Sequence, residues 1–186
     1  MAMTSQWTVD MVEAMPHVEG ERYEIIEGEL HVTTQPHYLH QAACANLVHE
    51  LRGWSRSGGG GLVLVAPGVI FAPDEAVAPD VVWIQGDRLA DVLGKDGKLH
   101  AAPDLVVEVL SPGKANQERD RERKAALYER RGLEEYWIVD WQAETVDLFR
   151  REGAHLRHAA ALGSGDVLRS PRLPGLEVPV KRLFES

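Results

Sequence analysis

The sequence predicts a mixed α/β (α+β) fold: a central mixed β-sheet flanked by helices and preceded by an N-terminal β-hairpin. Two observations lead to this fold class. Continuous runs of Val, Ile and Leu, typical of strands buried on both faces, occur at 61–71, 103–111 and 134–140. Two stretches with helical character, 36–54 and 116–132, alternate with these runs and can cover the two faces of one sheet.

The length of 186 residues suits one domain with a substantial core. We expect residues 1–20 to be a short helix and a linker, and residues 21–186 to form the single domain. The N-terminus has neither the basic start nor the long apolar run of a signal peptide. The longest apolar stretch is interrupted by Pro67 and Gly68 and is too short to span a bilayer. A cytoplasmic protein with no membrane segment is therefore expected.

The net charge of −9 argues against indiscriminate binding to nucleic acid, because phosphate contacts normally need a basic surface. Lysine and arginine are nevertheless concentrated between residues 114 and 131, and a solvated helix face is the common explanation of such a pattern. The single cysteine, Cys44, excludes an internal disulfide and a cysteine-rich zinc site. We expect it to be a buried residue of the first long helix.

The first half of the chain is expected to contain a hairpin, a helix and strands. Residues 22–32 predict the hairpin, because two strand-like runs flank Glu27-Gly28 and glycine accepts a positive φ. Residues 36–54 predict a helix whose buried stripe has a spacing of four, Leu39, Ala43, Leu47 and Leu51. The pattern then predicts strands at 61–71 and 78–84 and a short helix at 86–94.

The second half is expected to place a charged helix between two buried strands. The strand at 103–111 precedes the helix at 116–132, which Gly132 ends, and the strand at 134–140 follows. Residues 144–152 predict the start of a hairpin or an edge strand. Residues 172–184 contain prolines and are expected to pack across the outside.

Glu108 is anomalous, because it lies in the middle of the apolar strand 103–111 and an ionised carboxylate is costly to bury unless it is paired or bound to a metal. Strand alternation puts Asp104, Val106, Glu108 and Leu110 on one face. If the strand that begins at Asp80 is a neighbour, Asp80 and Glu108 converge. Two carboxylates beside a backbone carbonyl, such as that of Val109, suit Mg²⁺ or Mn²⁺.

Other interpretations of these carboxylates remain open at this point. Asp104 follows a proline and is expected to be structural, with its carboxylate bonded to turn amides. For Asp80 taken alone, this structural explanation and a functional one are equally good. A buried ion pair with Arg or Lys would also account for Glu108.

Asp120, Lys124 and Tyr128 are spaced i, i+4, i+8 and share one helix face. On spacing alone, an ordinary surface Asp–Lys pair is the better explanation. Tyr128, however, is expected to face the core, which would turn Lys124 toward the sheet. A lysine there can position or activate a water or hold a phosphate.

An ordered set of motifs resembles a known bacterial family. The segments are "YEIIEGEL", "PHYLHQ", "APDVVWI", "PDLVVEVLSP", D-x-x-x-K-x-x-x-Y from Asp120 to Tyr128, and "EEYWIVD". Together they resemble the Uma2 family (DUF820), which is similar to the PD-(D/E)xK nucleases. The resemblance implies a restriction endonuclease-like core and metal-dependent hydrolysis of phosphodiester bonds.

Carried over to this chain, the resemblance makes Asp80 and Glu108 the two motif acids. The superfamily pattern places a lysine two residues after the second acid, where this sequence has Leu110. The resemblance implies that Lys124 has taken over that role, with Lys114 as the second candidate. His40 matches a histidine of the family, and Glu24 and Glu29 match the hairpin motif, where a third carboxylate can approach the metal.

The leading hypothesis is a Mg²⁺- or Mn²⁺-dependent endonuclease, more suited to DNA than to RNA, which the resemblance implies is a homodimer. A catalytically silent nuclease-fold module that binds nucleic acid or protein is the alternative, favoured by the acidic composition. A zinc hydrolase using His37 and His40 lacks an evident third ligand. Paired carboxylates also occur in glycoside hydrolases, but aromatic residues, at 6%, give no evident sugar cleft.

Overall fold

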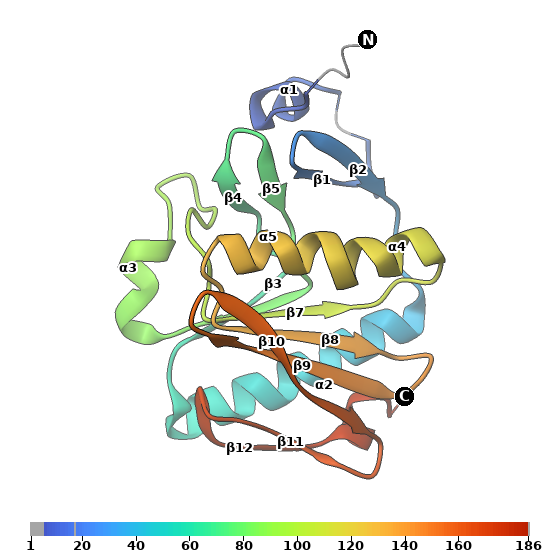
Figure 1. The fold of residues 1–186 in the computed structure, drawn as a ribbon, viewed down its shortest axis with the longest axis vertical. Coiled ribbons are helices and arrows are strands. Elements are labelled where there is room, and N and C mark those ends of the chain that lie inside the picture. Colours follow the sequence, from blue (N-terminus) through green and yellow to red (C-terminus); the bar gives the residue numbers. More distant parts are fainter. Residues whose placement is uncertain (1–5, 17, 186) are drawn as a thin grey trace.

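The computed structural model describes residues 6–16 and 18–185, and its centre is a six-stranded sheet in the order β10-β9-β8-β7-β6-β3 (Figure 1). β7 and β8 run parallel, whereas the other neighbouring pairs are antiparallel. The sheet is therefore mixed, as predicted. Its strands are β3 (Leu62–Val65), β6 (Val81–Ile84), β7 (Leu105–Val109), β8 (Glu135–Asp140), β9 (Thr145–Glu152) and β10 (His155–Gly163).

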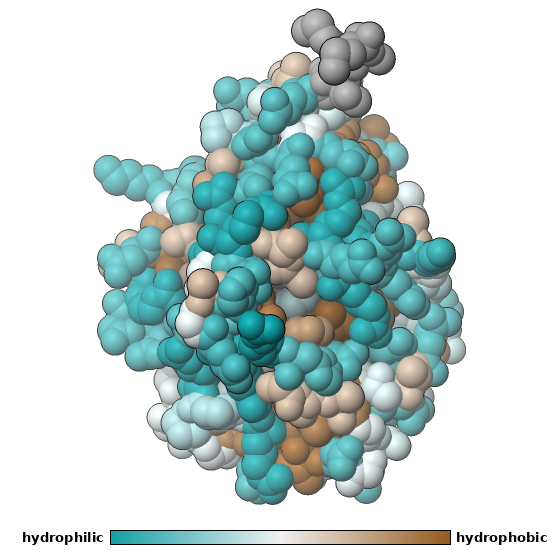
Figure 2. All heavy atoms as spheres, in the orientation of Figure 1, coloured by the Kyte–Doolittle hydropathy of each residue, from teal (hydrophilic) through white to brown (hydrophobic). Residues whose placement is uncertain are grey.

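Helices cover both faces of this sheet, which confirms the predicted fold class (Figure 1). One face packs against α2 (Tyr38–Trp54). The other packs against one long helix made of α4 (Lys114–Glu118), the wider π-helical turns η3 (Arg119–Lys124) and α5 (Ala125–Arg130). Residues are mostly hydrophilic on the face of the molecule seen in Figure 2, in agreement with a solvated outer side of the long helix.

The buried stripe of α2 differs from the prediction at its first position. Ala43, Leu47 and Leu51 are buried as expected, but His40 and not Leu39 occupies the first buried position. The helix begins at Tyr38 and His37 is its N-cap. A polar residue therefore lies at the end of an otherwise apolar stripe, where the core meets the carboxylates described below.

A second sheet, in the order β2-β1-β5-β4, was not predicted. The predicted hairpin is present, and Glu27 and Gly28 form its two-residue turn with φ of 54° and 74°. The single strand expected at 61–71 is wrong: Ala66 has a φ of 46° and Pro67 cannot donate to a ladder, so the chain leaves the large sheet after β3. The second sheet consists of β1 (Arg22–Ile26), β2 (Glu29–Thr33), β4 (Val69–Ala72) and β5 (Glu75–Val77).

The remaining elements surround these layers. The predicted 86–94 helix is η2 (Gly86–Arg88) followed by α3 (Leu89–Val92), and 144–152 starts a hairpin because β9 pairs with β10. The C-terminal segment covers α2 as β11 (Val167–Ser170), β12 (Leu173–Pro179) and η4 (Val180–Leu183). Two short helices remain, the π-helical η1 (Ser55–Gly59) and the α-helix α1 (Val9–Glu13), which lies within the predicted N-terminal segment. Of the predicted N-terminal segment 1–20, residues 1–5 and 17 lie outside the described residues.

Strand alternation in β7 agrees with the prediction. Leu105, Val107 and Val109 belong to the core beneath α2, whereas Val106 and Leu110 belong to the core beneath α5. Glu108 lies on the α5 side. Within the described part of the chain, no helix is both long and apolar enough to cross a membrane.

Candidate active site

Asp80 lies directly before β6, and three elements hold its buried carboxylate. Its Oδ2 accepts a hydrogen bond from the Val109 amide of β7 at 2.9 Å and lies 3.3 Å from Nε2 of His40 on α2. Its Oδ1 accepts from Nη1 of Arg22 on β1 at 3.2 Å. These three contacts therefore hold the carboxylate of Asp80 in place, and this carboxylate does not cap a turn.

Glu108 is the next carboxylate along the sheet. The antiparallel register pairs Val81 with Val107, so one further step along it brings Asp80 opposite Glu108. The Oε1 of Glu108 accepts hydrogen bonds from the Lys124 ammonium at 3.0 Å and from the Tyr128 hydroxyl at 2.9 Å. Both donors come from the long helix, on the shared face that the sequence predicts.

Lys124 is 1% exposed and lies among three carboxylates. Its Nζ is 3.0 Å from Glu108 Oε1, 2.9 Å from Glu24 Oε1 and 3.6 Å from Asp120 Oδ1. The wide turns of η3 bring Arg119 to the same place, with its Nε 3.0 Å from Asp120 Oδ1. Local π-type widening of a helix is frequent at functional sites.

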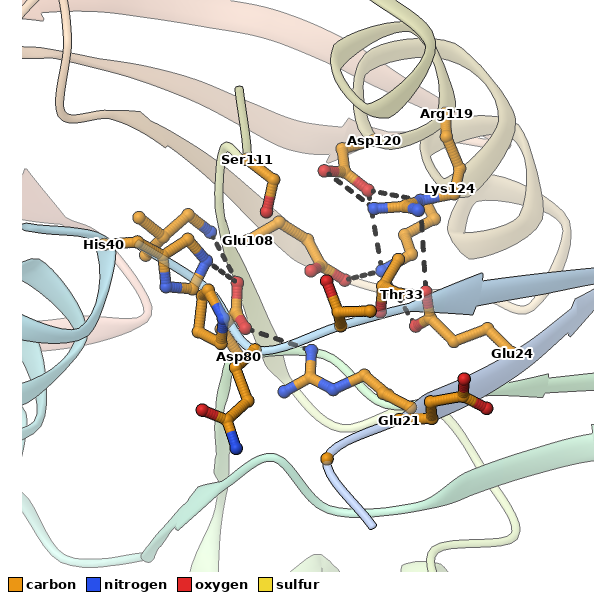
Figure 3. A pocket seen from close by; sticks show the side chains of 16 residues that line it. Glu21, Glu24, Thr33, His40, Asp80, Glu108, Ser111, Arg119, Asp120 and Lys124 are labelled. Carbon is orange, nitrogen blue, oxygen red and sulfur yellow. Dashed lines mark hydrogen bonds and ion pairs between the residues drawn. The ribbon is translucent and has the colours of Figure 1, made fainter. Parts of the chain in front are cut away.

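A cavity of about 270 Å³ joins these groups. Figure 3 shows the Glu108 carboxylate between Asp80 on one side and Lys124, Glu24 and Asp120 on the other. His40, Arg119 and Arg22 also line the cavity. The structure thus brings together the predicted Asp80, Glu108 and Lys124, together with the predicted supporting residues Glu24, His40 and Asp120; Tyr128 lies behind Glu108.

The charges of this cluster do not balance. Four buried carboxylates face three permanent cations; the carboxylates are Glu24, Asp80, Glu108 and Asp120, and the cations are Arg22, Arg119 and Lys124. Burial, reinforced by the neighbouring carboxylates, raises the pKa of Glu108 to about 8 in spite of Lys124. Glu108 is therefore the carboxyl group with too little positive charge around it.

Glu24, Asp80 and Lys124 remain charged at neutral pH. Burial would raise the pKa of Glu24, but Lys124 and the Ala78 amide outweigh it and lower that pKa below its usual value. The pKa of Asp80 is also lowered, because His40 and Arg22 outweigh desolvation. The surrounding carboxylates raise the pKa of Lys124 in spite of its burial, so this residue is an ammonium and not a free amine.

Three residues that the sequence also suggested lie outside the cavity. Lys114 is exposed at the first residue of α4. Glu29 is exposed and pairs with Arg123. His37 accepts the Leu39 amide as an N-cap and its ring stacks on Trp141 at 4.8 Å, so it does not converge with His40 on a zinc ion.

Two site residues, Arg22 and Arg119, were missed. A signal for Arg22 exists, because the period of two along β1 puts it on the same face as Glu24. Arg119 gave no such signal, because it lies outside the i, i+4, i+8 series of Asp120, Lys124 and Tyr128. In the wide turns of η3 both Arg119 and Asp120 are buried.

The basic segment 114–131 is largely neutralised by carboxylates from other elements. Arg121 contacts Asp140 and Asp147, and Arg131 contacts Glu75. These pairs tie the long helix to β8, β9 and β5. Arg119 and Lys124 of the same segment are buried in the carboxylate cluster, so only part of the segment is an ordinary helix face.

Asp104 has a structural role, in agreement with the sequence. Its Oδ2 accepts the Gln85 amide at 2.8 Å and its Oδ1 accepts from Arg88 at 2.6 Å. We expect Asp104→Ala to lower the free energy of unfolding by on the order of 2 kcal/mol, because it removes the buried acceptor of two hydrogen bonds, from the Gln85 amide and from Arg88. Urea unfolding measures this loss, and the exposed Asp91→Ala on α3 is the control, with a change within about 0.5 kcal/mol. Equal stabilities would contradict the structural role.

Comparison with known proteins identifies the family of this site. The family model Uma2, described as "Putative restriction endonuclease", matches residues 9–181. The chain belongs to the Uma2 family. A solved structure of a "putative nuclease belonging to DUF820" from Anabaena variabilis is similar, with a TM-score of 0.76 and 20% identity, over 95% of this chain and 97% of that chain. This likeness confirms the predicted nuclease fold; no curated protein matches the Uma2 chain.

Proposed function

We propose that this Uma2 protein is a metal-dependent endonuclease that hydrolyses phosphodiester bonds, with DNA as the favoured substrate over RNA. The observation that carries the proposal is the meeting of Asp80, Glu108 and Lys124 at one cavity. These residues come from positions far apart in the sequence, and they are the three that the family resemblance marks as catalytic.

The donor set fits Mg²⁺ or Mn²⁺. Asp80 and Glu108 supply carboxylate oxygens to the cavity, and the Val109 carbonyl is the proposed third protein ligand. The raised pKa of Glu108 marks the place where positive charge is lacking, and a divalent cation would supply it. When bound, such an ion lowers the pKa of a coordinated water and neutralises charge on a phosphate.

The other side chains of the cavity position these groups. Lys124 is held as an ammonium by Glu24 and Asp120, so we assign it to hold the attacking water or the phosphate by hydrogen bonding. A general base needs a pKa near the working pH, and Lys124 does not meet that requirement. His40 orients Asp80 through the 3.3 Å contact to its Oδ2.

Cleavage assays test the proposal directly. Purified protein is incubated with supercoiled DNA, single-stranded DNA and RNA in Mg²⁺, in Mn²⁺ or in a chelator. We expect cleavage of DNA with either metal and none with the chelator. Intact DNA and RNA under all metal conditions would contradict the nuclease proposal.

A silent binding module is the second candidate, and a specific observation favours it. Each proposed metal ligand already has internal partners, Asp80 with Arg22 and His40, and Glu108 with Lys124 and Tyr128. In such a module the cluster would be a structural ion network. It predicts nucleic-acid or protein binding that persists in chelator and is unchanged by Glu108→Gln. The homodimer and the cytoplasmic location remain predictions from the sequence.

A further inference from the structure

A second group of potential ligands lies on the α2 side of Asp80. His40 and Cys44 are one helical turn apart on α2, so their side chains share a face. His40 Nδ1 is 3.6 Å from Cys44 Sγ, and His40 Nε2 is 3.3 Å from Asp80 Oδ2. One ligand atom from each of the three residues lies within 4.8 Å of the others.

This donor set differs in chemistry from the pair Asp80 and Glu108. It offers one imidazole nitrogen, one sulfur and one carboxylate oxygen, which is a combination that Zn²⁺ accepts and Mg²⁺ does not. Zinc bonds of about 2.0 to 2.3 Å in a tetrahedron require ligand atoms roughly 3.3 to 3.8 Å apart. The contact to Asp80 has that spacing at Nε2 of His40, whereas the contact to Cys44 is made by Nδ1 of the same ring. Because a cation bonds only one of the two nitrogens, the half-buried Cys44 side chain has to rotate to bring its sulfur toward the nitrogen that faces Asp80.

A fourth coordination position is accessible. A cavity of about 430 Å³ adjoins the three residues and is also lined by Gln41, Val48 and Ala66. Three protein ligands with a fourth position open to water or a small ligand is the arrangement of open zinc sites.

We propose that His40, Cys44 and Asp80 form a binding site for a thiophilic divalent cation, and that Zn²⁺ is the cation it prefers. The cation bonds one imidazole nitrogen of His40, one oxygen of Asp80 and the sulfur of Cys44, whose thiol proton passes to solvent. Nuclease activity is not required for this site. Only one consequence rests on the proposed function: both sites use Asp80, so Zn²⁺ would compete with Mg²⁺ and inhibit cleavage.

Co²⁺ is the probe that tests the site, because its spectrum reports a sulfur ligand. Cys44 is the single cysteine of the chain, so a thiolate-to-cobalt charge-transfer band can come only from this residue. We expect one equivalent of Co²⁺ to produce the band in the full-length protein and Zn²⁺ to remove it. Cys44→Ser should abolish the band, and His40→Gln and Asp80→Asn should each weaken Co²⁺ binding at least about tenfold.

Two matched variants complete the experiment. His37→Asn keeps an N-cap residue and lies outside the cluster, so it should leave the band unchanged. Glu108→Gln should also keep the band, even where it removes Mg²⁺ binding, which separates this site from the proposed nuclease. Absence of the band in folded protein, as judged by circular dichroism, would overturn the proposal. A band that survives both His40→Gln and Asp80→Asn would also overturn it, because Cys44 would then bind cobalt without its two partners.

Discussion

Glu108→Gln is expected to abolish metal-dependent cleavage while leaving the folded state at least as stable as the wild type at pH 8. Glutamine has nearly the same shape and retains an oxygen that can accept from Lys124 and Tyr128. It cannot supply the anionic oxygen that Mg²⁺ requires. Cleavage should fall by at least about a hundredfold, which is the upper end of the cost of losing even an outer partner of a metal ligand.

The stability part of this prediction has a definite dependence on pH. The pKa of Glu108 in the folded protein is about 8, above the ordinary glutamate value. Between roughly pH 4.3 and pH 8 the unfolded chain loses this proton while the folded protein keeps it, so the wild type loses stability as pH rises through this window. Glutamine carries no such proton. The stability of Glu108→Gln relative to the wild type should therefore increase from pH 5 to pH 8 and then level off.

Urea unfolding at several pH values, with and without Mg²⁺, measures both effects. Mg²⁺ should stabilise the wild type by mass action and leave Glu108→Gln unchanged. Glu29→Gln is the matched control, because Glu29 belongs to the same motif set but is exposed on β2 and outside the cavity. Retained cleavage in Glu108→Gln would remove this residue from the catalytic assignment, and a pH-independent stability difference would contradict its raised pKa.

Much of the site was predictable, beginning with one residue that conflicts with its local surroundings. Glu108 interrupts an apolar strand, and that conflict alone marks a buried charge that needs a partner. Lys124 was predictable through Tyr128, whose core-facing position oriented the helix, and through the family resemblance. Strand alternation then indicated which face of β7 carries Glu108, and the register between β6 and β7 places Asp80 opposite it.

Other features depended on geometry that local patterns do not encode. The second sheet exists because the chain turns at Ala66 and Pro67 and carries β4 away from β3, although both strands consist of apolar residues. Arg119 lines the cavity from the wide turns of η3, outside the helix face that Asp120, Lys124 and Tyr128 share. Cys44 was expected to be a simple core residue, and its proximity to Asp80 depends on how α2 packs against the sheet.

Lys124→Met is expected to be the most destabilising of the substitutions considered. It removes the one ammonium shared by Glu24, Glu108 and Asp120, and all three carboxylates are almost fully buried. Breaking a buried ion pair by removing one partner typically costs about 3 to 5 kcal/mol, because the remaining charge is left uncompensated. The variant should unfold at lower urea concentration and should not cleave DNA.

The pH dependence distinguishes this cause from lost packing. Lys124 keeps its charge across the neutral range because its pKa is raised, so in the wild type its stabilisation is constant there. In Lys124→Met the Glu24 carboxyl loses the cation that lowers its pKa and takes up a proton in acid. The stability gap between the two proteins should therefore shrink as pH falls toward 4. A gap of constant size would indicate a packing defect.

A double variant separates folding from catalysis. Lys124→Met combined with Glu108→Gln removes the ammonium together with the carboxyl group that has to keep a proton in the folded state, and we expect it to recover part of the lost stability and to remain inactive. The exposed Lys114→Met is the matched control, with stability within about 0.5 kcal/mol of the wild type and unchanged cleavage. If Lys114→Met instead abolished cleavage while Lys124→Met, where folded, retained it, the loop lysine and not the helix lysine would hold the water or phosphate. The buried network around Lys124 would then serve only to keep Glu24 and Asp120 paired inside the fold.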